Sequence, residues 1–179
     1  MNPVRWSDDL IIDLNNSPAV CELDDYSIIP WDTSRDEEAR SVKNQAFMDH
    51  WGSTPTNAEG WNQLVHGSTA CLGASFFALD AHNKIVGLLL SHRYESDDEL
   101  LAKRIGWIDK VATLAEHRRK SVGNSLITHA LNAYKNVGLS HGALDVDTEN
   151  PTGAYGLYTS MGFTKFRSKV TYEKQIMMG

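Results

Sequence analysis

The sequence has only two cysteines, Cys21 and Cys71, and they stand fifty residues apart. This is neither the spacing of paired metal ligands nor the cysteine count of a disulfide framework. So little cysteine fits a reducing compartment, and we expect a cytoplasmic location. The six histidines from His66 onward form no i, i+4 pair and have no supporting cysteine, so no metal site is predicted.

Long apolar runs and an excess of positive charge are also missing. No apolar stretch approaches the ~18 residues that a transmembrane helix needs, and residues 1–20 lack the continuous apolar segment of a secretion signal. Lysine and arginine number 17 against 23 acidic residues, which gives a net charge of -6. Because phosphate backbones and anionic membranes repel such a chain, no nucleic acid and no membrane is expected as a partner.

Two common cofactor motifs are absent as well. Neither GxxxxGK nor GxGxxG occurs, which excludes P-loop and dinucleotide-binding folds on motif grounds. Residues 1–24 mix acids, Asn and Pro with one short apolar patch, and we predict an N-terminal arm there, with an integral strand as the alternative. Residues 25–179 contain no repeat or linker, and their length and apolar content suit one domain with one core.

Hydrophobic periodicity in residues 25–179 predicts alternating strands and helices. In chain order we expect a strand at 26–29, a helix from 33 to about 50, a helix from 56 or 57 to about 66, strands at 74–79, 85–92 and 105–114, a helix at 121–137, a strand at 143–146, a helix from about 151 to 161, and a strand or hairpin at 163–175. The fold class is α/β (α+β), a mixed and mostly antiparallel sheet of six to seven strands with helices on both faces.

The most informative local pattern is a strand that ends in a basic turn and leads into a helix. Arg118, Arg119 and Lys120 precede the first helical turn, where backbone N–H groups are unpaired and the helix dipole is positive. Ser121 and Gly123 are small and leave those amides open to phosphate oxygens. The pattern is typical of an anion-binding nest, and a solvated basic turn is the alternative.

This turn resembles the coenzyme-A signature Q/R-x-x-G-x-G/A of the GNAT superfamily of acetyl-CoA N-acetyltransferases. Ser121 departs from the signature, which has glycine there, and serine carries a cost if the backbone needs a positive φ. The resemblance implies that the strand end binds the pantetheine arm of acetyl-CoA and that the turn amides bind its pyrophosphate. The residues so implied are Val111, Ala112, Thr113, Arg118, Arg119, Lys120, Ser121, Val122, Gly123 and Asn124.

A second stretch resembles the family signature N-x(7)-L/Y-Y-x-x-x-G-F, and the resemblance as a whole covers residues 25–175 and implies the GNAT fold. Asn150 either hydrogen-bonds the pantetheine or caps the next helix, and the two roles are compatible. Tyr158 matches the family's acid, because a phenol of pKa ~10 can protonate a departing thiolate whose own pKa is ~8.5. Its alternative role is that of a core residue with its hydroxyl at the rim.

An amine is charged at pH 7 and must lose a proton before it can attack a thioester. Strand alternation places Asp109 on one face with Trp107 and Val111, and Lys110 on the other, so Asp109 interrupts an apolar run beside the inferred thioester site. Asp109 is the first candidate base, with an ordinary ion pair as the alternative. Asp145, on the neighbouring strand at a position where relatives often carry an acid, is the second.

The run 46–52 lies where the first two predicted helices meet, a region that lines the acceptor pocket in related enzymes. Asp49, His50 and Trp51 are candidates to bind or deprotonate an amine, and an ordinary helix C-terminus is the alternative. This run and the segment around Asn150 look most like the C-terminal half of mycothiol synthase and similar tandem GNAT proteins. Since only one half is present, a homodimer could replace the missing surface.

These patterns together predict an N-acetyltransferase. It would transfer an acetyl group from acetyl-CoA to a primary amine of a small-molecule or peptide acceptor, by direct attack in a ternary complex and without a metal. The alternative is a catalytically silent CoA-binding module that regulates or scaffolds.

Overall fold

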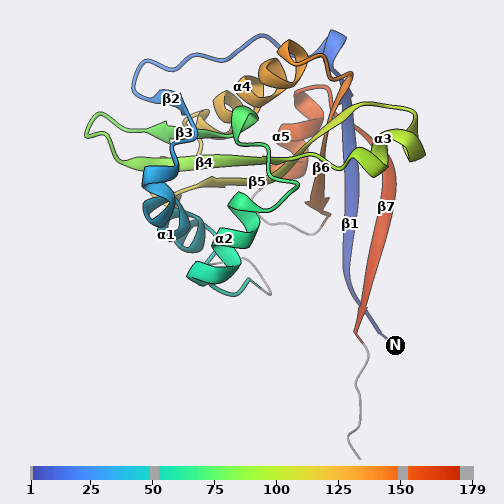
Figure 1. Ribbon diagram of the computed structural model, residues 1–179, viewed down its shortest axis with the longest axis horizontal. Coiled ribbons are helices and arrows are strands. Elements are labelled where there is room, and N and C mark those ends of the chain that lie inside the picture. Colours follow the sequence, from blue (N-terminus) through green and yellow to red (C-terminus); the bar gives the residue numbers. More distant parts are fainter. Residues whose placement is uncertain (1, 49–52, 149–152, 174–179) are drawn as a thin grey trace, which may run out of the picture.

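Seven strands form one sheet in the order β2-β3-β4-β5-β6-β1-β7 in the computed structural model, which describes residues 2–48, 53–148 and 153–173 (Figure 1). The strands are β1 (Asn2–Asp13), β2 (Ser27–Pro30), β3 (Phe76–Leu79), β4 (Ile85–His92), β5 (Ile105–Thr113), β6 (His141–Asp147) and β7 (Thr164–Glu173). The helices are α1 (Asp36–Ala46), α2 (Ala58–His66), α3 (Glu95–Leu101), α4 (Val122–Asn136) and α5 (Ala154–Ser160). Strands β5 and β6 pair in parallel and the other pairs are antiparallel. The predicted fold class is confirmed.

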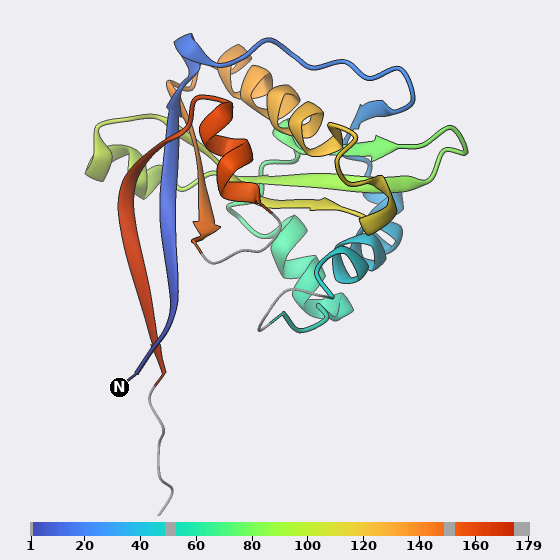
Figure 2. The same cartoon turned by 180° about the vertical axis from the view of Figure 1, so that it is seen from behind.

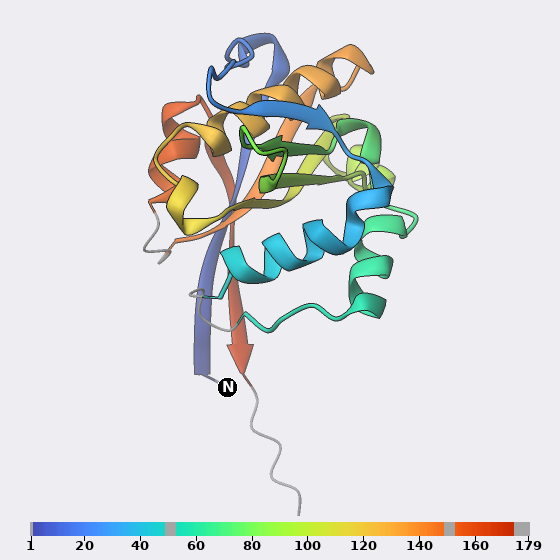
Figure 3. The same ribbon diagram turned by 90° about the vertical axis from the view of Figure 1, so that its left-hand side faces the viewer.

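Helices cover both faces of the sheet, as predicted. Helices α1 and α2 lie against one face, and α4 and α5 lie against the other (Figure 3). Helix α4 packs because its apolar residues recur at helical period, and Leu126, Ile127 and Leu131 are fully buried. Across the described ranges, no helix combines the length and apolarity that crossing a bilayer requires.

The end of α4 follows its sequence signals closely. Tyr134 is fully buried, and its hydroxyl donates a hydrogen bond to Ser91 Oγ at 2.6 Å. A Cβ added to Gly106 would lie 2.6 Å from the Tyr134 ring, so only glycine fits on β5 at that point. Gly138, with φ of 76°, then ends the helix in the predicted place.

Residues 2–13 differ from the expectation of an arm, because they form β1 inside the sheet, between β6 and β7. Leu10 and Ile12 are 0% and 3% exposed, so the short apolar patch belongs to the core. The acidic composition of the segment suggested an arm, but Asp8 and Asp9 are buried and bonded to β7. The Asp9 partner Arg167 lies 158 positions away, a pairing that local composition cannot reveal.

Strands β1 and β7 extend past the rest of the sheet as a two-stranded ribbon (Figures 1 and 2). Pairing of β1 with β6 begins only at Ser7, whereas its pairing with β7 begins at Asn2. Trp6 and Val170 are register partners and are 43% and 38% exposed, and Tyr172 farther along β7 is 56% exposed. The ribbon therefore presents large apolar side chains to solvent.

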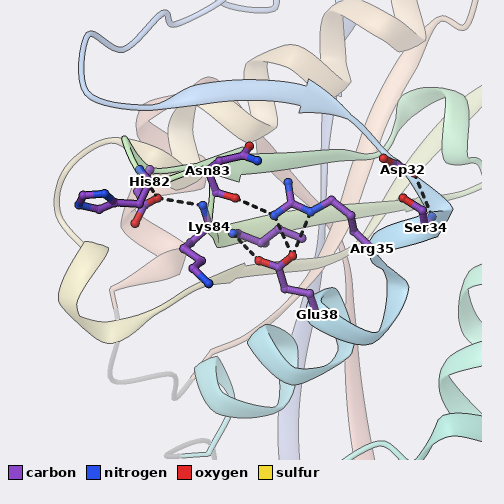
Figure 4. A network of polar contacts seen from close by, with 9 residues as sticks. Asp32, Ser34, Arg35, Glu38, His82, Asn83 and Lys84 are labelled. Carbon is purple, nitrogen blue, oxygen red and sulfur yellow. Dashed lines mark hydrogen bonds and ion pairs between the residues drawn. The ribbon is translucent and has the colours of Figure 1, made fainter.

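The β3–β4 hairpin is fixed to the start of α1 by charged side chains. Arg35 bonds Glu38 Oε2 at 2.7 Å and the Asn83 carbonyl at 2.9 Å, and Glu38 accepts the Ile85 N–H at 2.9 Å (Figure 4). The predicted hairpin at 80–83 is confirmed. The helix expected from 33 to about 50 is shorter, since residues 33–35 form a 3-10 turn and α1 ends at Ala46.

Candidate functional site

Strands β5 and β6 separate halfway along their length. Their parallel pairing ends at Ile108 and Leu144, after which β5 pairs only with β4 and β6 pairs only with β1. The β5 edge from Asp109 to Thr113 thus has no strand partner on its β6 side among the described residues. An exposed strand edge of this kind can bind an extended ligand through main-chain hydrogen bonds. The predicted pantetheine residues Val111, Ala112 and Thr113 lie on this edge.

A β-bulge marks the point of separation. Leu90 pairs with Lys110 and Ser91 pairs with Ile108, so Asp109 is the extra residue on β5. The bulge breaks the alternation that was expected to put Asp109 and Lys110 on opposite faces. Their side chains instead form an ion pair, with Lys110 Nζ 2.9 Å from Asp109 Oδ2. The ion pair stated as the alternative for Asp109 is therefore present.

The turn after β5 presents a row of unpaired amides. None of the six backbone N–H groups from Arg119 to Asn124 donates a hydrogen bond to another described residue. Arg119 and Ser121 adopt positive φ values of 59° and 61°, which bend the chain into α4. The positive φ at Ser121 is the condition under which serine carries a cost relative to the glycine of the signature. A concave row of N–H groups at a helix N-terminus binds anions.

The basic side chains of this turn divide into two kinds. Arg118 points back into the protein, where its guanidinium bonds the Thr113 carbonyl at 3.2 Å and the Ala46 carbonyl at 2.9 Å. It joins the end of α1 to the end of β5. Arg119 and Lys120 are exposed and form no ion pair within the described part of the chain. A Cβ added at Gly123 would contact no atom outside the neighbouring backbone within 4 Å, so the space beside Gly123 is open.

Tyr158 lies on α5, on the α4 side of the sheet. Its ring packs edge to face against Phe163 at 6.1 Å between centroids. No group in residues 2–48, 53–148 or 153–173 hydrogen-bonds its hydroxyl, and burial raises the pKa of Tyr158 to about 12. The phenol is therefore neutral at physiological pH and free to donate. The predicted residues Asn150, Asp49, His50 and Trp51 lie outside the described residues.

Asp109 and Asp145, the two candidate bases, line one cleft of about 310 Å³ on the bulge side of β5. The full lining consists of Tyr94, Ser96, Asp97, Trp107, Ile108, Asp109, Asp145, Arg167 and Lys169. Tyr158 is not part of it. Sequence reasoning missed Tyr94, Asp97, Arg167 and Lys169, since nothing local indicates that the segment after β4 and the last strand meet beside the bulge.

A buried carboxylate organises the β7 side of this cleft. Asp9 is 0% exposed, and Arg167 and Lys169 approach its two oxygens at 2.5 and 2.7 Å. Lys169 also bonds Asp145 at 2.5 Å, and Ser7 Oγ donates to the same Asp145 oxygen at 3.0 Å. Burial would lower the pKa of Lys169, but its bonds to Asp145 and Asp9 outweigh burial and raise it. Asp145 is therefore held in an ion pair.

Residues 33–163 match the family model described as the acetyltransferase (GNAT) family. Among solved structures, a GCN5-related N-acetyltransferase from Sphaerobacter thermophilus has a TM-score of 0.76 at 20% identity, over 94% of this chain and 51% of that chain. An aminoglycoside N-acetyltransferase AAC(6')-Iy in complex with CoA has a TM-score of 0.63 at 18% identity, over 84% of this chain and 95% of that one.

A tandem GNAT protein from the clavulanic acid biosynthesis pathway has a TM-score of 0.65 at 12% identity, over 93% of this chain and 52% of that chain. This chain thus spans about half the length of the Sphaerobacter and tandem proteins. No curated protein gives a match. Among the described residues, no group of three or more His, Cys, Asp or Glu is arranged to hold a metal ion.

Proposed function

The chain belongs to the GNAT acetyltransferase family, as its two signatures predicted, and on that premise we propose that it transfers an acetyl group from acetyl-CoA to a primary amine. The acceptor is a small molecule or a peptide, and the amine attacks the thioester directly in a ternary complex. The observation that carries this proposal is the row of six unpaired amides from Arg119 to Asn124, because free amides at a helix N-terminus bind phosphate groups such as a pyrophosphate.

Acetyl-CoA would bind with its phosphates on this row and with Arg119 and Lys120 adding positive charge. Its pantetheine arm would then pass along the free edge of β5 at Val111, Ala112 and Thr113, with Asn150 beside it. That path directs the thioester to the bulge at Asp109, where β5 and β6 separate. A backbone amide at the bulge would polarise the thioester carbonyl.

The proton balance assigns the acids and bases. Of the three protons on the acceptor ammonium, one passes to Asp109 before attack, one stays on the amide product, and one ends on the thiol of coenzyme A. The new bond joins the amine nitrogen to the carbonyl carbon, and the carbon–sulfur bond breaks with its electron pair on sulfur. Asp145 is the second candidate base. Both carboxylates are paired with a lysine, and Asp109 is proposed first because it lies on the bulge where β5 and β6 separate.

Tyr158 assists the departing thiolate. Burial raises the pKa of Tyr158 to about 12, above the ~8.5 of a thiol, so complete transfer of its proton to the thiolate is unfavourable. The phenol therefore acts mainly as a hydrogen-bond donor to the developing thiolate, and any proton it gives is replaced as the amide nitrogen loses its own. Asp49, His50 and Trp51 are the proposed acceptor-binding residues of the segment after α1.

We also propose that the protein acts in the cytoplasm and that two copies pair through the ribbon of β1 and β7. A two-stranded ribbon is marginally stable in water, and Trp6, Val170 and Tyr172 would gain cover from a second copy. Light scattering should give a dimer mass for the unmodified chain and a monomer mass for the double variant Trp6→Ser, Tyr172→Ser. A monomer at high micromolar concentration would refute the pairing.

The proposed function is tested in two steps. Thermal unfolding is first followed against acetyl-CoA concentration, which should raise the melting temperature. Release of free thiol is then measured over a panel of primary amines. Binding together with thiol release supports the enzyme, whereas binding with no release over the panel supports the silent CoA-binding module. Absence of binding at millimolar acetyl-CoA would remove both.

A further inference from the structure

Four of the five charged side chains in the cleft beside Asp109 are already neutralised. Asp109 is paired with Lys110, and Asp145 is paired with Lys169. Lys169 and Arg167 together share the fully buried Asp9. The charges of Arg167 and Lys169 are thus already balanced by the carboxylates of Asp9 and Asp145, and the cleft has no surplus of positive charge to attract an anionic ligand.

The fifth charged side chain, Asp97, is different. Neither a cation nor a hydrogen-bond donor in the described residues contacts its carboxylate, and its backbone N–H bonds the Tyr94 carbonyl at 3.0 Å. It is only partly exposed and lines the cleft together with Asp109. The cleft therefore has one unbalanced negative charge, and it is carried by α3.

Aromatic rings stand beside this charge. The rings of Tyr94 and Trp107 both line the cleft and meet edge to face with centroids 6.4 Å apart. Burial and the nearby carboxylates of Asp109 and Asp97 raise the pKa of Tyr94, so its ring stays neutral. A carboxylate next to neutral aromatic faces suits an organic cation, which gains both an ion pair and a cation–π contact.

Resting on the proposed function, we infer that the acceptor carries a second cationic group, which Asp97 and Tyr94 bind while the reacting amine lies at Asp109. The acceptor class is thus a diamine or polyamine rather than a monoamine or an amino acid. A cleft of about 310 Å³ is at the small end of ligand sites, which favours a compact acceptor. The reacting amine still loses its proton to Asp109, and the second cation keeps its own.

The test compares matched acceptors at saturating acetyl-CoA. Initial rates of thiol release are measured for 1-aminobutane, 1,4-diaminobutane and 4-aminobutanoate, and for diamines of three to six carbons. We expect kcat/KM for the best diamine to exceed that of 1-aminobutane at least tenfold and 4-aminobutanoate to be the poorest substrate. Asp97→Asn should raise KM for the diamine about tenfold, with kcat and the monoamine reaction nearly unchanged.

Glu99→Gln is the matched control, because Glu99 lies on the same helix, is exposed and does not line the cleft. Its kinetics should equal those of the unmodified chain, and thermal melting of both variants should show intact folding. Equal kcat/KM for monoamine and diamine, or preference for 4-aminobutanoate, would overturn the inference and leave the acetyltransferase intact. No thiol release with any amine would instead refute the proposed function itself.

Discussion

The turn at residues 118–124, proposed to bind the cofactor, and the cleft beside Asp109, proposed to bind the acceptor, are built in opposite ways. The turn uses the backbone of six consecutive residues, Arg119 to Asn124, and needs only small side chains and a helix start. The cleft uses side chains from four segments that meet only when the sheet is complete. Local backbone sites can therefore be recognised in one sequence, whereas side-chain sites of this kind depend on strand register.

The two regions also differ in how their charges are balanced. Arg119 and Lys120 at the turn have no ion pair within the described residues, so they remain available to a polyanion. In the cleft, Arg167 and Lys169 are bonded to Asp9. Of the charged side chains that line it, Asp97 alone has no ion pair or side-chain hydrogen bond to another described residue. The proposals above use this contrast: the anionic cofactor would bind at the turn and a cationic acceptor in the cleft. Variants on either side test it.

The largest effect is expected on the cleft side, from Asp109→Asn. An amide cannot accept the ammonium proton, so kcat should fall about 10²–10³-fold while acetyl-CoA affinity stays nearly intact. Steady-state rates and calorimetric titration check the two quantities. Asp145→Asn is the comparison variant, and an unchanged rate for Asp109→Asn alone would remove Asp109 from the mechanism.

A somewhat smaller effect is expected from Tyr158→Phe, about 10²-fold in kcat, because a thiolate is already a fair leaving group without an acid. The phenyl ring preserves the packing against Phe163, so the melting temperature should not change. Single-turnover measurements with a saturating amine separate this step from product release. Loss of acetyl-CoA binding in place of turnover would show that Tyr158 serves the cofactor and not the chemistry.

On the turn side, Gly123→Asp should separate stability from affinity. An acidic residue in the first turn of α4 interacts favourably with the positive end of the helix dipole. The added side chain also enters open space, so the stability of the fold should not decrease. The same charge repels the pyrophosphate, and acetyl-CoA affinity should fall roughly 10–100-fold. Gly123→Asn adds a side chain of the same shape without the charge, so it should lose much less acetyl-CoA affinity. Equal losses would mean that phosphate does not bind here.

Asp98→Asn should lower the stability of the fold around α3, the helix that carries the cleft residue Asp97. Asp98 bonds Arg93 at 2.5 Å and accepts the Ile105 N–H at 3.1 Å, which holds α3 and hence Asp97 in place. The bond to Arg93 lowers the pKa of Asp98 in the folded protein. The ionised Asp98 carboxylate therefore stabilises the fold above about pH 4, and this stabilisation is lost as the pH falls through the folded-state pKa. The variant should lose about 1–3 kcal/mol at pH 7.

Urea unfolding at pH 7 and at pH 3 measures this effect. The difference in the free energy of unfolding between the unmodified chain and Asp98→Asn should be smaller at pH 3, because Asp98 itself becomes protonated there. A gap that stays constant between the two values would contradict the assignment of this stability to the Asp98 charge.

The smallest effect is expected from Ser121→Gly. Glycine adopts a φ of 61° without the steric cost that serine carries, but it loses more conformational entropy on folding. The first effect is the larger, so the free energy of unfolding should rise by about 0.5–1 kcal/mol. Acetyl-CoA affinity should stay equal or improve. A loss of stability measured by urea unfolding would show that the Ser121 side chain contributes something beyond its backbone.

The same contrast explains what the sequence could predict. Helix α4, the β3–β4 hairpin and the turn at 118–124 follow from local periodicity and turn chemistry. Strand β1 was expected only as the alternative to an arm, because acidic residues such as Asp8 and Asp9 are usually exposed, and their partners on β7 cannot be identified from local sequence. Helix α3 was missed because seven mostly acidic residues show no apolar stripe. The bulge at Asp109 follows from pairing with β4, so alternation alone misplaced Lys110.

Hydrogen exchange at the backbone amides of residues 119–124, with and without saturating coenzyme A, tests the central claim most directly. These six amides have no acceptor in the described residues, so they should exchange fast in the free protein and become strongly protected when the pyrophosphate binds. Unchanged exchange at all six, with protection appearing on another part of the chain, would contradict the account.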